Sequence, residues 1–219
     1  MLNDFIEYIY ILPAALVAIV LHEMAHGYVS YWLGDPTPKE YGRLSFNPIK
    51  HIDPLGALCL IFFHVGWAKP VMINPSYYKN PKWGTALVSL AGPLMNFILA
   101  FLSAFFMVLS VYLAQVKGIA FFEYIYKFFL YGTIINIGLG LFNLIPIPPL
   151  DGSKILGAFL PKNAYYQYMK YQRYGMIFLI IILLVMDVLT TYGLPSLLDN
   201  LIETIYSFLV SIFSKMFFN

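Results

Sequence analysis

The sequence predicts an all-α polytopic membrane protein with about five to six transmembrane helices and a short re-entrant or β-hairpin segment near the functional site. Two observations lead to this fold class. Of the 219 residues, 60% are hydrophobic and only 11% are charged, whereas an ordinary soluble domain carries about 25% charged residues. The apolar residues also gather in long runs, and a soluble protein of this size could not bury so much apolar surface, so lipid is the expected solvent.

Five apolar runs reach the roughly 20 residues that a helix needs to cross a bilayer. They are Phe5–Leu33, Trp83–Leu113, Glu123–Ile145, Tyr171–Thr191 and Pro195–Phe217. A sixth run, Leu55–Trp67, corresponds to only about 20 Å of helix. This length is too short for a comfortable crossing, so the run could be re-entrant, and whether it spans is left open.

Two irregular segments, Gly34–Pro54 and Ala68–Lys82, separate these runs and are rich in Pro, Gly, Asn and Lys. Within the first, the alternating pattern of Tyr41–Phe46 indicates a short strand. Neither segment is long or apolar enough to form a soluble domain. We therefore expect one membrane-embedded domain over residues 1–219, with a core at about 5–157 and additional C-terminal helices at about 171–217.

Basic residues predict the orientation in the membrane. If Leu55–Trp67 does not span, one side holds most of the cations: Lys39, Arg43, Lys50, Lys69, Lys79, Lys82, Lys154, Lys162, Lys170 and Lys215. The opposite side holds Lys117 and the acidic N-terminal residues Asp4 and Glu7. The positive-inside rule then makes the basic side cytoplasmic and the N-terminus extracytoplasmic in a multi-pass protein of the cell membrane.

The pattern His22-Glu23-Met24-Ala25-His26 lies inside the first apolar run. Two histidines four positions apart share one face of a helix, so both imidazoles can reach one zinc ion. A glutamate beside the first histidine can act as the general base on a zinc-activated water. Intramembrane ionisable groups are costly, and three within five positions favour a functional site. His22 lies about 22 Å along the helix from Glu7, past mid-membrane towards the cytoplasmic face.

A catalytic zinc site generally has three protein ligands, and the best candidate for the third is Asp151. It follows the run Glu123–Ile145, which crosses in the same direction as the first run, so both ligand sets reach the cytoplasmic half. Pro146, Pro148 and Pro149 cannot continue a regular helix. Unwound backbone at membrane depth is tolerated where it lines a wet cavity, although these prolines could simply end a helix.

Three motifs together resemble the site-2 protease family of intramembrane zinc metalloproteases: His22-Glu23-x-x-His26, Gly92-Pro93-Leu94-Met95-Asn96, and Asn143…Pro146…Leu150-Asp151-Gly152. The chain is similar to the compact branch of that family, without a PDZ or CBS domain. The resemblance implies one Zn²⁺ per chain, held by His22, His26 and Asp151, with Glu23 as catalytic base. It also implies a role for Asn96 and Asn143 in binding substrate or an oxyanion, although a buried Asn such as Asn96 can equally serve only to join helices by hydrogen bonds. The expected partners are membrane proteins with transmembrane segments, cut in or near those segments.

The alternatives are a zinc-binding membrane transporter and a non-catalytic membrane scaffold. The net charge of +2 gives no reason to expect nucleic acid. His51 and Asp53 could form an accessory metal pair, although such residues more often cap or turn the chain before a helix. His64 is expected at an interface. The oligomeric state, the substrate, its cleavage site, any prior cleavage and the gating mechanism are left open.

Overall fold

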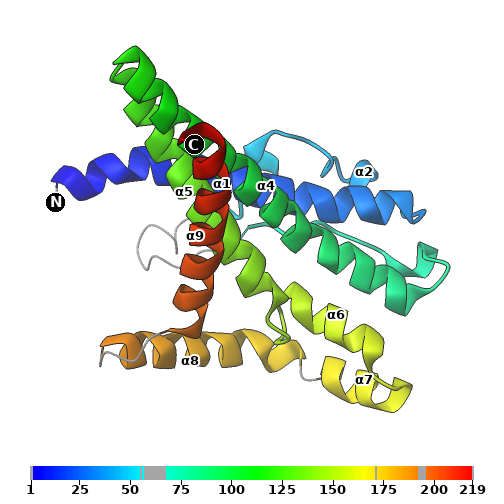
Figure 1. Ribbon diagram of the computed structural model, residues 1–219. Coiled ribbons are helices and arrows are strands. Elements are labelled where there is room, and N and C mark those ends of the chain that lie inside the picture. The colour runs from blue at the N-terminus through cyan, green and yellow to red at the C-terminus, as the bar shows by residue number, and fades with distance from the viewer. Residues whose placement is uncertain (1, 55, 57–67, 171, 192–195, 219) are drawn as a thin grey trace. The chain divides into compact units, whose positions relative to one another are not determined.

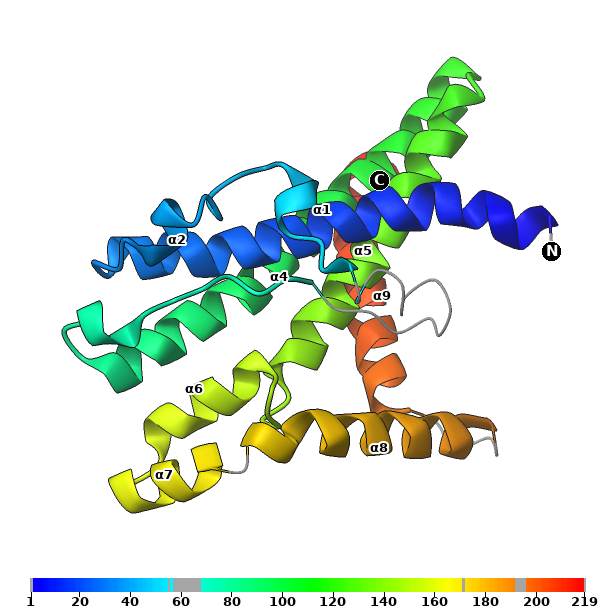
Figure 2. The same ribbon diagram turned by 180° about the vertical axis from the view of Figure 1, so that it is seen from behind.

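The computed structural model describes residues 2–54, 56, 68–170, 172–191 and 196–218, and Figures 1 and 2 show it from two sides. The regular structure of these residues is helical. In chain order the helices are α1 (Leu2–Trp32), α2 (Thr37–Glu40), η1 (Pro48–Lys50), η2 (Pro75–Tyr77), α4 (Pro81–Lys117), α5 (Phe121–Leu144), α6 (Asp151–Phe159), α7 (Lys162–Lys170), α8 (Gln172–Thr191) and α9 (Leu197–Phe218).

Four of the described helices are long and apolar enough to cross a bilayer: α1 over Glu7–Trp32, α4, α5 and α9. They correspond to four of the five predicted spans, so the prediction of a multi-pass helical membrane protein is confirmed. Helix α8 forms where the fifth span was predicted but is not among these four, so its crossing stays a prediction. Apart from Gly56, the run Leu55–Trp67 lies outside the described residues.

The predicted strand at Tyr41–Phe46 is wrong, and no β-hairpin occurs among the described residues. The backbone turns here instead: Gly42 has φ +62°, and the N–H groups of Gly42 and Arg43 donate to the carbonyls of Lys39 and Pro38. These local bonds use backbone groups that a strand would offer to a partner strand. Among the described residues, β-type backbone pairing is limited to one antiparallel bridge, between Ile52 and Ala68.

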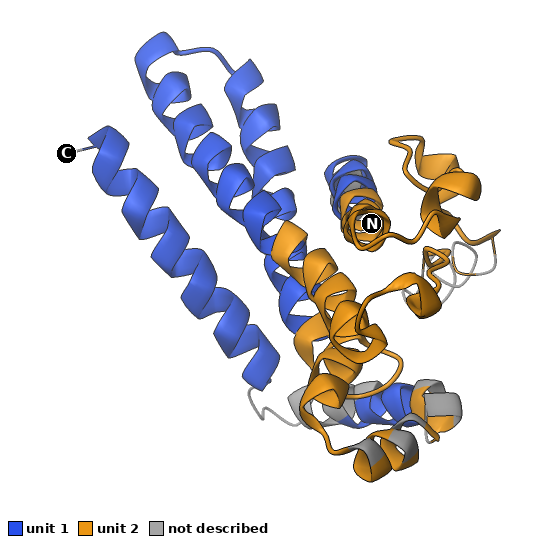
Figure 3. Cartoon of the chain, turned by 90° about the vertical axis from the view of Figure 1, so that its right-hand side faces the viewer, with its two compact units in different colours: residues 1–18, 96–142, 178–219 blue, residues 19–95, 143–177 orange. Residues whose placement is uncertain are grey.

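The described chain divides into two compact units, coloured separately in Figure 3. Unit 1 contains residues 1–18, 96–142 and 178–219, and unit 2 contains residues 19–95 and 143–177. The core of unit 1 is built from α4, α5 and α9. Its buried apolar side chains are Ala100, Ala104, Met107, Val108, Ile137, Leu209 and Phe213.

In unit 2, a buried carboxylate joins the end of α1 to the segment that precedes α4. Asp35 Oδ2 accepts hydrogen bonds from the Ser30 hydroxyl (2.8 Å) and the Asn74 N–H (2.7 Å), and Oδ1 accepts one from the Thr37 N–H (3.0 Å). Burial by itself would raise the pKa of Asp35, but these hydrogen bonds to the ionised form hold that pKa below its usual range. Asp35 therefore fixes the path of the chain around residue 74.

The proline-containing stretch between α5 and α6 ends one helix and begins the next. Residues 145–150 have no helical repeat, and α6 starts at Asp151. Gly152, the residue after Asp151, has no room for a side chain. A Cβ at this position would lie 2.2 Å from the Leu144 carbonyl oxygen and 2.6 Å from that of Ile145. This close approach packs the first turn of α6 against the end of α5 and fixes the position of Asp151.

Candidate metal centre

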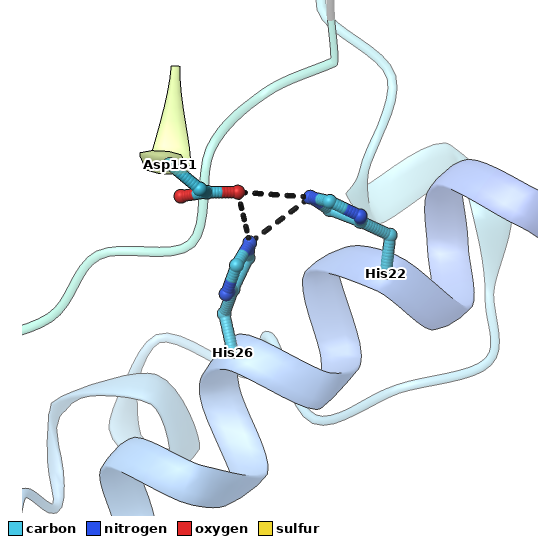
Figure 4. Close-up of side chains that lie close together, drawn as sticks. All are labelled: His22, His26 and Asp151. Atoms are coloured by element: carbon cyan, nitrogen blue, oxygen red, sulfur yellow. Dashed lines mark hydrogen bonds and ion pairs between the residues drawn. The ribbon is translucent and has the colours of Figure 1, made fainter. Parts of the chain in front are cut away.

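His22 and His26 on α1 meet Asp151 at the start of α6, and all three belong to unit 2 (Figure 4). The Nε2 atoms of the two histidines lie 3.0 Å apart. Asp151 Oδ2 lies 3.3 Å from His22 Nε2 and 3.1 Å from His26 Nε2. The three residues are buried, with 6%, 9% and 8% of their surface exposed. The sequence-predicted ligand set is thus brought together at one point.

The spacing of these atoms fits one zinc ion. In a tetrahedral zinc site with ligand bonds of about 2.0–2.2 Å, two ligand atoms stand about 3.3–3.6 Å apart. The observed separations of 3.0, 3.1 and 3.3 Å differ from this by a few tenths of an ångström. Two imidazole nitrogens and one carboxylate oxygen are also a common donor set for catalytic zinc, which keeps a fourth position for water. The residues present therefore fit the metal.

A hydrogen bond behind His26 and an ion pair behind Asp151 orient these two candidate ligands. His26 Nδ1 lies 2.6 Å from the Val88 carbonyl oxygen on α4. A carbonyl only accepts, so Nδ1 carries the proton and the lone pair of Nε2 faces the cluster. Asp151 Oδ1 lies 3.6 Å from Lys154 Nζ. Burial would raise the pKa of Asp151, but its contacts with the two imidazoles and the charge of Lys154 hold that pKa well below its usual range, so the carboxylate is ionised.

Helix α4 approaches both imidazole rings at Gly92. A Cβ built on Gly92 would lie 2.5 Å from Cε1 and Nε2 of His26 and 2.6 Å from Cε1 of His22. Real non-bonded carbon atoms do not approach this closely. Position 92 of the Gly92-Pro93 motif therefore requires glycine, because any side chain there would occupy the space of the two imidazole rings.

Glu23 lies on the next position of α1 after His22, and its carboxylate is held by the chain before α4. Its Oε2 accepts a hydrogen bond of 2.9 Å from the Val71 N–H. Glu23 also lines a cavity of about 200 Å³ together with the three candidate ligands. The rest of the cavity wall is Pro70, Val71, Ile73, Val88, Ser89, Asn143, Pro149, Leu150 and Lys154. The Glu23 carboxylate and the candidate metal centre thus share one cavity.

The other sequence-predicted residues have different surroundings. Asn143 lines the cavity. Asn96 belongs to unit 1, is fully buried, and donates to Asn136 Oδ1 at 2.8 Å. Its role in binding substrate stays a prediction. Asp53 accepts from the Gly56 N–H at 2.9 Å, which agrees with a turn-forming role, and His51 Nε2 donates to the Ser45 carbonyl at 2.8 Å. His64 lies outside the described residues.

Sequence reasoning missed several residues of the cavity wall. Ser89 is 1% exposed, and its hydroxyl has no hydrogen-bond partner within the described ranges. Pro93 lies inside α4 and lacks the N–H that would bond the Ser89 carbonyl four positions earlier. The proline inside an apolar run was a usable signal that the Ser89 carbonyl lacks its usual helical hydrogen bond. Val71 offered none, because it acts through its backbone N–H.

Comparison with known proteins places this constellation in a family. The model described as "Peptidase family M50" matches residues 10–124 and 110–186. The chain belongs to peptidase family M50. It is a zinc metalloprotease of the site-2 protease family, as its sequence motifs indicated.

Three relatives within M50 show how much of the chain is shared. The protein named "Putative zinc metalloprotease YwhC" of Bacillus subtilis is 36% identical over 207 residues, which cover 94% of both chains. "Zinc metalloprotease MJ0392" of Methanocaldococcus jannaschii is 30% identical over 77% of this chain and 39% of its own length. "Putative zinc metalloprotease Rip2" of Mycolicibacterium smegmatis is 29% identical over 66% of this chain and 55% of its own. No solved structure matches the chain.

Proposed function

We propose that this M50 protein is an intramembrane endopeptidase that hydrolyses peptide bonds in or near the transmembrane segments of other membrane proteins. One observation carries the proposal. The two histidines and Glu23 lie on α1, a helix apolar enough to cross a bilayer, and they share a cavity with Asp151. Family membership supports a membrane-protein substrate.

His22, His26 and Asp151 are the proposed ligands of one zinc ion per chain. Zinc in such a site lowers the pKa of water towards 7 and polarises a carbonyl group. Glu23 accepts the proton of the attacking water and returns it to the nitrogen of the leaving amine as the carbon–nitrogen bond breaks. The Val71 N–H holds the Glu23 carboxylate during both transfers. Asn143 in the cavity wall is a proposed donor to the substrate or the oxyanion.

A substrate helix must unwind before cleavage, because its carbonyl groups are engaged in its own hydrogen bonds. The 68–74 segment offers a docking edge for the unwound chain. Pro70, Val71 and Ile73 of this segment line the cavity. The segment has no helical turn (Figure 2), and within the described part of the chain the backbone groups of Met72 and Ile73 make no hydrogen bond. An extended substrate can add to such an edge by backbone pairing.

The proposed orientation follows the charge asymmetry of the sequence. The N-terminus is placed outside, and the cavity opens towards the cytoplasmic side, from which water enters. Reporter fusions to the N-terminus and to the loop after α4 measure this directly. A cytoplasmic N-terminus would reverse the orientation.

Glu23→Gln tests the hydrolase function against transport and scaffold functions. The amide preserves the shape of the side chain and removes the base, so we expect zinc to be retained at one per chain while cleavage stops. Glu40→Gln, at an exposed position on α2, is the matched control and is expected to behave as wild type. Zinc is measured by elemental analysis of purified protein.

The substrate is found by comparing membrane proteomes of cells that make wild type, Glu23→Gln or Glu40→Gln protein. A full-length membrane protein that accumulates only with Glu23→Gln supports the proposal. If the proteomes are equal, and vesicles containing wild type or Glu23→Gln protein pass zinc at equal rates, the protein is a zinc transporter and the proposal fails. If the proteomes are equal and no zinc flux is measured, the non-catalytic scaffold is the remaining alternative.

A further inference from the structure

The position of the Glu23 carboxylate depends on a backbone N–H that does not belong to a helix. Val71 donates that hydrogen bond at 2.9 Å, and it lies within the irregular 68–74 segment. A helix holds its own N–H groups in place, but a segment without helical bonds depends on contacts with other parts of the chain. The Lys69 N–H donates to the His51 carbonyl at 2.8 Å, and two charged side chains hold the segment on either side of Val71 along the chain.

Arg43 holds the segment just before Val71. Its guanidinium donates to the carbonyls of Lys69 and Pro70, the two residues that precede Val71, and also to that of Lys50. Arg43 is only 5% exposed. A planar guanidinium presents several donors in a fixed arrangement, so it binds three carbonyls at once and sets their relative positions.

Asp35 holds the segment just after Val71. Its Oδ2 accepts the Asn74 N–H at 2.7 Å, and the same oxygen accepts the Ser30 hydroxyl at 2.8 Å. Ser30 also contacts the Tyr78 hydroxyl at 2.7 Å. Ser30 lies on α1, the helix that carries Glu23, so Asp35 ties the segment to the element that bears the carboxylate.

We propose that Arg43 and Asp35 are positioning residues for the general base, which act by holding the Val71 N–H against Glu23. This inference rests on the proposed function, because it gives Glu23 the role of base. Neither residue lines the cavity, so neither has to touch substrate. A displacement of about 1 Å in a catalytic group can cost about a hundredfold in rate, so loss of either contact is expected to lower kcat while zinc stays bound.

The first test needs no substrate. Hydrogen–deuterium exchange of the Val71 amide is compared among wild type, Arg43→Gln, Asp35→Asn and Glu23→Ala. Loss of one hydrogen bond changes the opening equilibrium about tenfold, so we expect about tenfold faster exchange in each variant. The matched controls are Lys39→Gln, an exposed cation on α2, and Asp53→Asn, which bonds the Gly56 N–H. Both controls should exchange as wild type.

The second test measures turnover on the substrate that the proteomic comparison identifies. We expect Arg43→Gln to lower kcat about 10–100-fold with KM and zinc content unchanged. Added guanidinium should restore part of the rate of Arg43→Ala, which a general loss of structure would not allow. If Arg43→Gln fails to fold, Arg43→Lys provides the same comparison, because it keeps the charge without the planar donor set.

Unchanged Val71 exchange in Arg43→Gln and Asp35→Asn overturns the inference, and so does unchanged kcat. Loss of zinc in parallel with kcat also overturns it, because it would show a structural role. Failure of the proposed function looks different: wild type itself would cleave nothing, while the Val71 amide would still respond to Arg43, Asp35 and Glu23.

Discussion

Gly92→Ala adds one methyl group where α4 meets the two candidate zinc ligands. The new Cβ would lie 2.5 Å from His26 Cε1 and Nε2 and 2.6 Å from His22 Cε1. Non-bonded carbon contacts settle at about 3.5 Å, so both rings must move by about 1 Å or α4 must retreat by that distance. Zinc sites tolerate errors of only about 0.2 Å in ligand distance. The substitution therefore acts directly on the metal centre.

The magnitude follows from the cost of overpacking. An added methyl group in a close-packed region typically costs about 1–3 kcal/mol. If the rings return to the zinc-binding geometry at this cost, zinc affinity falls about 5- to 160-fold. The assay is a competition titration of purified protein against a zinc chelator, with peptide cleavage measured at saturating zinc.

Gly138→Ala on α5 is the matched control, because a Cβ there would lie 3.5 Å from Ile202 Cδ1, an ordinary contact. It is expected to keep the zinc affinity and thermal stability of wild type. Wild-type zinc affinity in Gly92→Ala would refute the reasoning, since it would mean that the rings and α4 do not compete for the same space.

Two further predictions concern carboxylates. Asp151→Asn removes the charged ligand, so zinc affinity should fall by more than the roughly 10–100-fold typical of changes outside the ligand set. The control Asp199→Asn on α9 should not change the zinc affinity measured in the chelator titration. Equal zinc affinities of Asp151→Asn and wild type would show that Asp151 is not a ligand. The pKa of Asp35 is held below its ordinary value of 3.8, so its ionised form contributes stability that is present above about pH 4 and is lost as pH falls below that value. Lowering the pH from about 4 to about 2 should thus lower the thermal unfolding temperature of wild type more than that of Asp35→Asn. Parallel curves of unfolding temperature against pH would contradict this.

The candidate ligands could be predicted from sequence because their chemistry depends on local spacing. His22 and His26 share a helix face whatever surrounds the helix. Asp151 was more distant, but the direction of successive spans placed it in the same half of the membrane, and the proline-rich stretch before it indicated broken helix. Helix ends were predicted to within a few residues because Pro and Gly punctuate the long runs.

The supports of the site could not be predicted in the same way. Arg43 sits in a stretch whose alternation favoured a strand, and its contacts with Lys69 and Pro70 exist only in the folded chain. Asp35 precedes Pro36 and is typical of a turn, so nothing local indicated its bond to Asn74. Val71 acts through an N–H that every non-proline residue possesses. Such roles follow from tertiary contacts, which composition and periodicity do not encode.

The proposed zinc ligands are far apart in the sequence: two lie on α1 and one lies on α6. During synthesis, α1 leaves the ribosome and enters the membrane long before Asp151 is made. A chain at that stage holds two histidines and a glutamate, but it lacks the charged third ligand of a catalytic zinc site. On the proposed function, a chain that ends before Asp151 therefore cannot form the complete zinc site.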